Sequence, residues 1–97
     1  VVYIEAAQAL GQMMTERKGS LDDRLTYLFR RCLTRSPEAN ELKLLSQYFR
    51  EQHQRFRKGD LEAGKLAGGG KGDAAKRAAW TVLARSLLNL DEFITKN

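Results

Sequence analysis

Few residues of this chain have a type and spacing that could do chemistry. The chain contains one Cys and one His. Cys32 lies between Leu28 and Leu33 on an apolar helical stripe, and no His is near in sequence to activate its thiol, so we interpret it as a core residue rather than a nucleophile. His53 also falls on an apolar stripe, with no Asp, Glu or Cys three or four residues later. We therefore expect no metal there, but a histidine at the edge of the core that donates to a carbonyl group.

Two pairs of adjacent carboxylates are the other candidates for acid–base chemistry. They are Asp22-Asp23 and Asp91-Glu92. Successive helical positions point about 100° apart, so neither pair converges on one substrate atom. We interpret Asp22 and Asp23 as stabilising a helix N-terminus. We expect Asp91 or Glu92 to bond Arg85 or a backbone amide.

A glycine-rich run invites comparison with a phosphate-binding loop. The run is Gly-Gly-Gly-Lys-Gly at residues 68–72. Lys65 stands where such a loop needs its first glycine, Gly72 stands where it needs the magnesium-binding Ser or Thr, and no strand precedes it. We therefore predict that residues 60–73 form a flexible surface loop, and we expect neither enzyme activity nor a cofactor in this chain.

Basic residues outnumber acidic ones, 17 to 12, for a net charge of +5. The excess gathers in residues 17–35 and 50–77, and either segment could bind a polyanion by releasing counterions. The candidate polyanion-binding residues are Arg30, Arg31, Arg35, Arg50, Arg55, Arg57 and Lys58. Acidic residues interrupt both segments, and neither a recognition-helix turn nor an aromatic stacking platform is visible, so the pattern disfavours nucleic acid. Salt-sensitive binding of nucleic acid or an acidic polysaccharide remains the alternative function.

Length and composition predict one small helical domain. The chain has 97 residues, of which 42% are hydrophobic and one is Pro. That length allows a single core, one Cys excludes an internal disulfide, and no apolar run approaches the roughly 20 residues of a membrane-spanning helix. Leu and Ala are more frequent than β-branched residues, which favours helix over strand. We predict an all-α fold, a small bundle of four main helices with a glycine-rich loop before the last.

Periodicity and capping signals predict where the helices lie. Apolar residues at helical spacing predict helices over residues 3–17, 21–33 and 37–58 and from residue 73 or 74 onward. Gly19 and Gly59 can end the first and third helices, and Ser20 can cap the second with Asp23. Short first and second connections predict antiparallel neighbours.

The last predicted helix has the broadest apolar face of the chain. It should therefore lie at the centre of the bundle. Trp80 is its largest residue, and we expect it to anchor the core with a hydrogen-bond acceptor for its indole N–H. Phe93 and Ile94 continue the apolar pattern, so we predict a final turn that packs back on the bundle.

Three stretches resemble a known family. They are residues 79–94 (AWTVLARSLLNLDEFI), residues 3–10 (YIEAAQAL) and residues 29–37 (FRRCLTRSP) with Glu41-Leu42. Together they resemble the C-terminal part of the planctomycete-type domain of unknown function number fifteen fifty-three. The family usually has Thr or Ser after the proline, with Glu three residues later. Glu38 stands in place of that Thr or Ser, so Ser36 is the alternative cap, and we expect the third helix to begin within one turn of Pro37.

The resemblance implies a location and neighbours rather than a reaction. Members of that family are exported multidomain proteins that carry cytochrome-c-like domains, and some carry carbohydrate-binding modules. Haem c is therefore expected elsewhere in a parent protein, and its Cys-x-x-Cys-His attachment motif is absent from this sequence. The chain begins without Met, and we therefore interpret the chain as a C-terminal fragment excised from such a protein. The expected function is a non-catalytic helical module, periplasmic or at the cell surface, that packs against neighbouring domains or a protein partner.

Overall fold

The computed structural model describes residues 2–59 and 73–95, with side chains for residues 5–59 and 73–89. These residues form helices and short connections, without strands. The helices are α1 (Val2–Glu16), α2 (Leu21–Leu33), α3 (Ala39–Arg57) and α5 (Ala74–Thr95). The predicted all-α fold of four main helices is confirmed. The predicted glycine-rich loop lies outside the described residues, apart from Asp73.

Local signals end α1 and begin α2 as predicted. Gly19 has φ +123°, a backbone conformation that favours glycine. Ser20 is the N-cap of α2, and its Oγ accepts a hydrogen bond from the Asp23 N–H at 3.1 Å. At the far end, Thr34 adopts the left-handed conformation with φ 57°, and its N–H donates to the Arg30 carbonyl at 2.9 Å. That cap was not predicted, because Thr rarely takes the place of Gly there.

Helix α3 begins two residues after Pro37, within the one turn that was predicted. Its N-cap is Glu38 rather than Ser36. The Glu38 N–H donates to Glu41 Oε1 at 2.8 Å, so a carboxylate three residues into the helix satisfies a backbone group that would otherwise lack a partner. Gly59, with φ +81°, follows the end of α3 as predicted.

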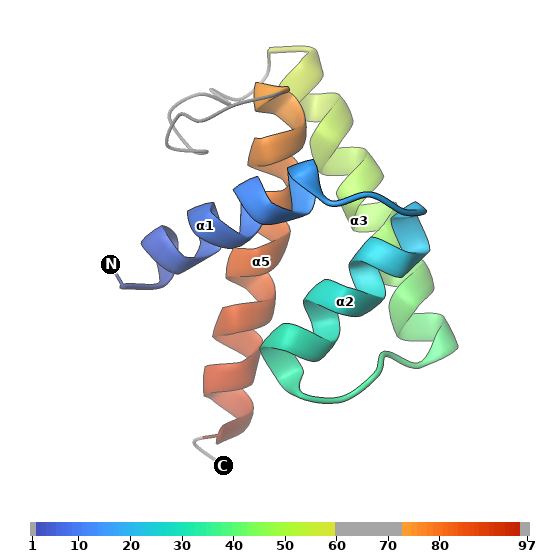
Figure 1. Cartoon of the computed structure of the whole chain (residues 1–97), viewed down its shortest axis with the longest axis vertical. Coiled ribbons are helices and arrows are strands. Elements are labelled where there is room, and N and C mark those ends of the chain that lie inside the picture. Colours follow the sequence, from blue (N-terminus) through green and yellow to red (C-terminus); the bar gives the residue numbers. More distant parts are fainter. Residues whose placement is uncertain (1, 60–72, 96–97) are drawn as a thin grey trace.

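Helix α5 is the centre of the bundle, as predicted. It contacts all three other helices, and Figure 1 shows α1 crossing it steeply while α3 runs antiparallel beside it. Buried residues occur almost all around its first four turns, which is typical of a central helix. Contacts between α1 and α2 are sparse. The predicted pairing of these two helices was therefore wrong, because α1 buries its apolar stripe against α5 instead.

A glycine lets α1 approach α5 closely. A side chain at Gly11 would clash with Thr81 Oγ1 and would lie 3.1 Å from the Arg77 carbonyl oxygen. Ala7 and Met14 flank this crossing on α1 and are fully buried. The tight crossing therefore depends on the absence of a Cβ atom at residue 11.

Trp80 anchors the core on the other side of α5. It is fully buried, and its ring centroid lies 4.3 Å from that of Phe49 on α3. Its indole N–H has no hydrogen-bond acceptor among the described residues, so the expected acceptor was not found. The backbone of α5 continues through Phe93 and Ile94 to Thr95 as one helix. The side chains of residues 90–95 lie outside the described residues, so the predicted packing of this final turn stays a prediction, as do the expected bonds of Asp91 or Glu92.

Candidate functional site

Two hollows lie on adjacent faces of α3, one against α5 and one against α2. The first, which we call the α3–α5 groove, has a volume of about 520 Å³. Its lining residues are Phe29, Glu41, Leu44, Leu45, Gln47, Tyr48, Glu51, Leu83, Ser86 and Leu87. Most of these side chains are apolar, so the groove offers a surface for an apolar partner rather than a set of reactive groups.

The floor and the wall of the α3–α5 groove differ in burial. Phe29, Leu83 and Leu87 are buried and belong to the core. Leu44, by contrast, is 65% exposed, and it is the one large hydrophobic residue in the described part of the chain that is exposed. A single exposed leucine is common on protein surfaces, so Leu44 matters here because it lies beside the other apolar side chains that line the groove.

All the charged side chains that line the groove are acidic. They are Glu41 and Glu51. Arg35 Nη1 and Nη2 donate to the two carboxylate oxygens of Glu41, each at 2.9 Å. The Arg35 hydrogen bonds and the Glu38 N–H lower the pKa of Glu41 to about 2. Glu51 forms no ion pair within the part of the chain that the structure describes.

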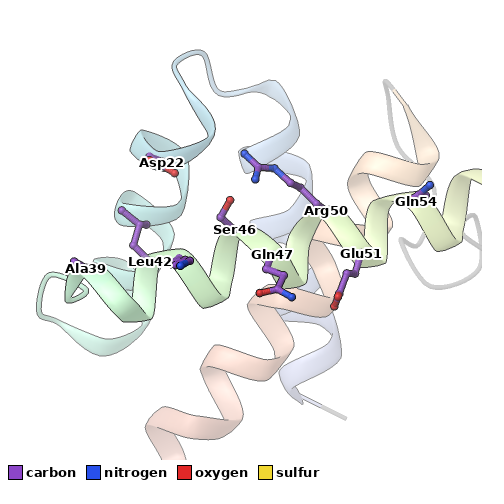
Figure 2. Close-up of a pocket in the computed structure, with 9 residues that line it drawn as sticks. Asp22, Ala39, Leu42, Ser46, Gln47, Arg50, Glu51 and Gln54 are labelled. Atoms are coloured by element: carbon purple, nitrogen blue, oxygen red, sulfur yellow. The ribbon is translucent and has the colours of Figure 1, made fainter.

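The second hollow is polar, with a volume of about 610 Å³ between α2 and α3. Figure 2 shows Ser46 and Arg50 pointing to the side of α3 on which Asp22 lies. Ser46 is 8% exposed, and the residues that line the hollow with it include the carboxylates Asp22 and Glu51 but neither His nor Cys. The mixture of Asp22, Lys43, Arg50 and Glu51 makes this a solvated polar surface.

The structure places three arginines around Tyr27. The Arg17 guanidinium carbon lies 3.7 Å from the Tyr27 ring centroid, and Arg31 Nη1 donates to Tyr27 Oη at 3.4 Å. Arg30 and Arg31 line a surface hollow of about 470 Å³ with Tyr27, Thr26 and the acidic residue Asp23. We call Tyr27, Arg17, Arg30 and Arg31 the Tyr27 arginine cluster. Arg17 was not among the predicted site residues, because only the tertiary fold brings the end of α1 to the face of α2.

The other predicted polyanion-binding residues do not join this cluster. Arg35 pairs with Glu41 and lies with its guanidinium carbon 4.9 Å from the Phe29 ring centroid. Arg50 lines the polar hollow. Arg55 and Lys58 line a shallow hollow near the end of α3, and Arg57 is exposed nearby. The seven predicted residues therefore lie in several separate places and form no single patch.

His53 and Cys32 both lie on apolar stripes as predicted. Cys32 is 5% exposed and belongs to the core. The His53 ring centroid lies 5.8 Å from that of Phe49, and its Nε2 is buried. Among the described residues no carbonyl accepts a hydrogen bond from Nε2, so the expected hydrogen bond is not seen there. Burial lowers the pKa of His53.

Residues 2–59 and 73–95 contain neither a metal-binding group nor a membrane-spanning helix. No three Asp, Glu, His or Cys side chains come together as a metal-binding group there. None of the helices in that part of the chain is long and apolar enough to cross a bilayer.

Comparison of the chain with models of known protein families, curated proteins and solved structures found no significant match. The resemblance to the domain of unknown function therefore stays a prediction.

Proposed function

We propose that this chain is a non-catalytic helical interaction module that binds a helix of a neighbouring domain or partner protein in the α3–α5 groove. The observation that supports this most is Leu44, which is 65% exposed beside the buried residues Leu83 and Leu87. Covering one leucine side chain contributes about 1.5–3 kcal/mol. A helix that lays its apolar face into this groove would gain that energy from several side chains at once.

The proposal includes the setting that the resemblance implies. The neighbouring domains would be those of an exported protein that also carries cytochrome-c-like domains. The apolar lining of the groove supports a packing or binding role within such a protein, because a packing partner needs apolar area rather than reactive groups.

A peptide selection against the α3–α5 groove tests the proposal. A displayed library of amphipathic helical peptides is selected on the protein, and each selected peptide is then measured on Leu44→Gln. We expect binding to weaken by about tenfold to a hundredfold, because the leucine side chain no longer contributes apolar contact. Arg57→Gln, at another exposed position of α3 that does not line the groove, is the control and should leave binding unchanged. Peptides that bind both variants equally, or a library that yields no binders, would contradict the proposal.

The Tyr27 arginine cluster supports a second candidate function, salt-sensitive binding of a polyanion. Tyr27 contacts both Arg17 and Arg31 and so holds two guanidinium groups on one surface. Guanidinium groups held in place lose less entropy when they bind phosphate or sulfate.

Titration with a sulfated polysaccharide at low and high salt tests this candidate. We expect binding to weaken steeply as the salt concentration rises. The double variant with Arg30→Gln and Arg31→Gln should lower the affinity more than the double variant with Arg55→Gln and Arg57→Gln. Both double variants remove the same charge. No binding at low salt, or equal losses in the two variants, would reject the cluster as the site.

A further inference from the structure

We propose that the occupant of the α3–α5 groove is a basic amphipathic helix, with Glu51 as the residue that selects for its positive charge. This inference rests on the proposed function and adds the chemistry of the partner. It depends on a contrast between the groove and the whole chain. The chain has a net charge of +5, yet the charged residues that line the groove are all acidic.

The spacing along α3 sets the geometry of the partner. Glu41, Leu44, Leu45, Tyr48 and Glu51 recur at the three- and four-residue intervals that form one helix face. The two carboxylates stand at opposite ends of this face, roughly 15 Å apart along the helix axis at the helical rise. A partner helix of about three turns therefore covers the apolar stretch, with one flank at Glu51 and the other at the Arg35–Glu41 ion pair.

The two carboxylates are not equivalent. Glu41 already accepts hydrogen bonds from Arg35 and from the Glu38 N–H. Glu51 is exposed and has no ion pair within the described part of the chain, although Arg55 and Lys58 line a neighbouring hollow with it. Glu51 is therefore the acidic residue that can accept a new cation without breaking an existing pair, and it should contribute most of the charge selectivity.

The same arrangement disfavours a second copy of the chain as the occupant. In a symmetric antiparallel pair of α3 helices centred between Leu45 and Gln47, Glu41 of each copy faces Glu51 of the other. Like charges placed opposite each other destabilise such a pair. A helix with positive flanks meets no such repulsion.

Two synthetic helical peptides test the inference on the full chain. Both peptides carry four leucines with the spacing i, i+3, i+4 and i+7, which places them on one helix face. One peptide has lysines on either side of these leucines, and the other has glutamates there. Amide chemical shifts of the isotope-labelled protein locate the binding site, and titration gives the affinities. We expect shifts centred on Leu44 and Tyr48, and an affinity about threefold to tenfold higher for the lysine peptide, the range of partly exposed charge pairs.

A pair of charge reversals provides the decisive control. Glu51→Lys should abolish or reverse the preference for the lysine peptide. Glu5→Lys changes the net charge equally but lies on α1, which contributes no residue to the groove, so it should leave the preference unchanged. An equal effect of both variants would mean that the overall charge, rather than Glu51, sets the preference, and would overturn the inference.

The remaining outcomes separate this inference from the proposed function. Equal binding of both peptides in the groove would leave the proposed function standing and reject the basic partner. Shifts away from the groove, or no binding by either peptide, would reject both. A concentration-dependent dimer that Leu44→Gln abolishes would reject the basic helix in favour of a second copy.

Discussion

Helices α1 and α3 both pack on α5, but they leave very different surfaces behind. At the α1 crossing, Gly11 lets the two backbones approach until Thr81 and the Arg77 carbonyl lie against α1. At the α3 contact, large rings fill the interface, with Phe49 and Trp80 centroids 4.3 Å apart. Helix separation follows the size of the side chains between the axes.

The contrast explains why, among the described residues, an apolar groove borders the contact between α3 and α5. Small residues at the α1 crossing, Ala7 and Gly11, let the two helices pack closely. Between α3 and α5, bulky residues such as Phe49 and Trp80 fill the contact while the neighbouring stretch near Leu44 and Leu87 stays open as the groove. A well-packed core and an open binding surface can therefore share one central helix.

The largest expected effect comes from the groove floor. Leu83→Ala removes a side chain that is 1% exposed and should lower the free energy of unfolding by about 2–5 kcal/mol. Urea denaturation measures this loss. The same truncation at exposed Leu44 is the control and should cost far less. A loss below about 1 kcal/mol at Leu83 would mean that the floor relaxes to fill the cavity.

Overpacking the α1 crossing should have the next largest effect. Gly11→Val places side-chain atoms against Thr81 Oγ1 and the Arg77 carbonyl, and should destabilise the fold by about 1–3 kcal/mol. Ala9→Val puts the same side chain on an exposed position of α1 and should change stability little.

A double-mutant cycle tests whether this clash is specific. Thr81→Ala removes Oγ1, so it should recover part of the loss caused by Gly11→Val. Additive effects of the two substitutions would show that the crossing adjusts without strain between these residues.

The free energy of unfolding should fall at lower pH because of His53, which lies on α3. Burial lowers the pKa of this histidine, nearby Arg57 and Lys76 lower it further, and Asp73 opposes them. The unfolded chain therefore binds the proton more readily. This contribution to stability is present above the unfolded pKa of about 6.5 and is lost as pH falls through the lower pKa of the folded state.

Denaturation at pH 7.5 and pH 5.5 measures this dependence. His53→Gln should lose less stability between these two values than the unchanged protein does. Equal losses in the two proteins would assign the pH dependence to other groups.

The smallest effect on stability is expected at the groove wall. Leu44→Gln should change the free energy of unfolding by no more than about 0.5 kcal/mol, because its side chain is 65% exposed. Thermal unfolding measures this change. A clear loss of stability would show that Leu44 contributes to the fold, and its binding effects would then need a second wall variant, such as Tyr48→Gln.

The candidate sites were predicted less completely than the helices. The basic segments and the core positions of Cys32 and His53 were visible in the sequence, because a residue's place on a helix face follows from its spacing. The Arg17–Tyr27 contact joins α1 to α2, and the groove wall of α3 meets floor residues of α2 and α5. Such contacts between distant segments leave no regular spacing in a single sequence.

What the sequence by itself determined was the helical class and most helix ends, because caps, glycine stops and apolar periodicity act within a few residues along the chain. Even there, the choice of Glu38 over Ser36 as a cap depended on a carboxylate that also holds Arg35. Only the tertiary structure decided that α1 packs on α5 rather than on α2, and that an apolar groove with acidic ends remains beside α3. Those outcomes depend on how side chains from separate helices fill the space between them, which is a property of the assembled fold.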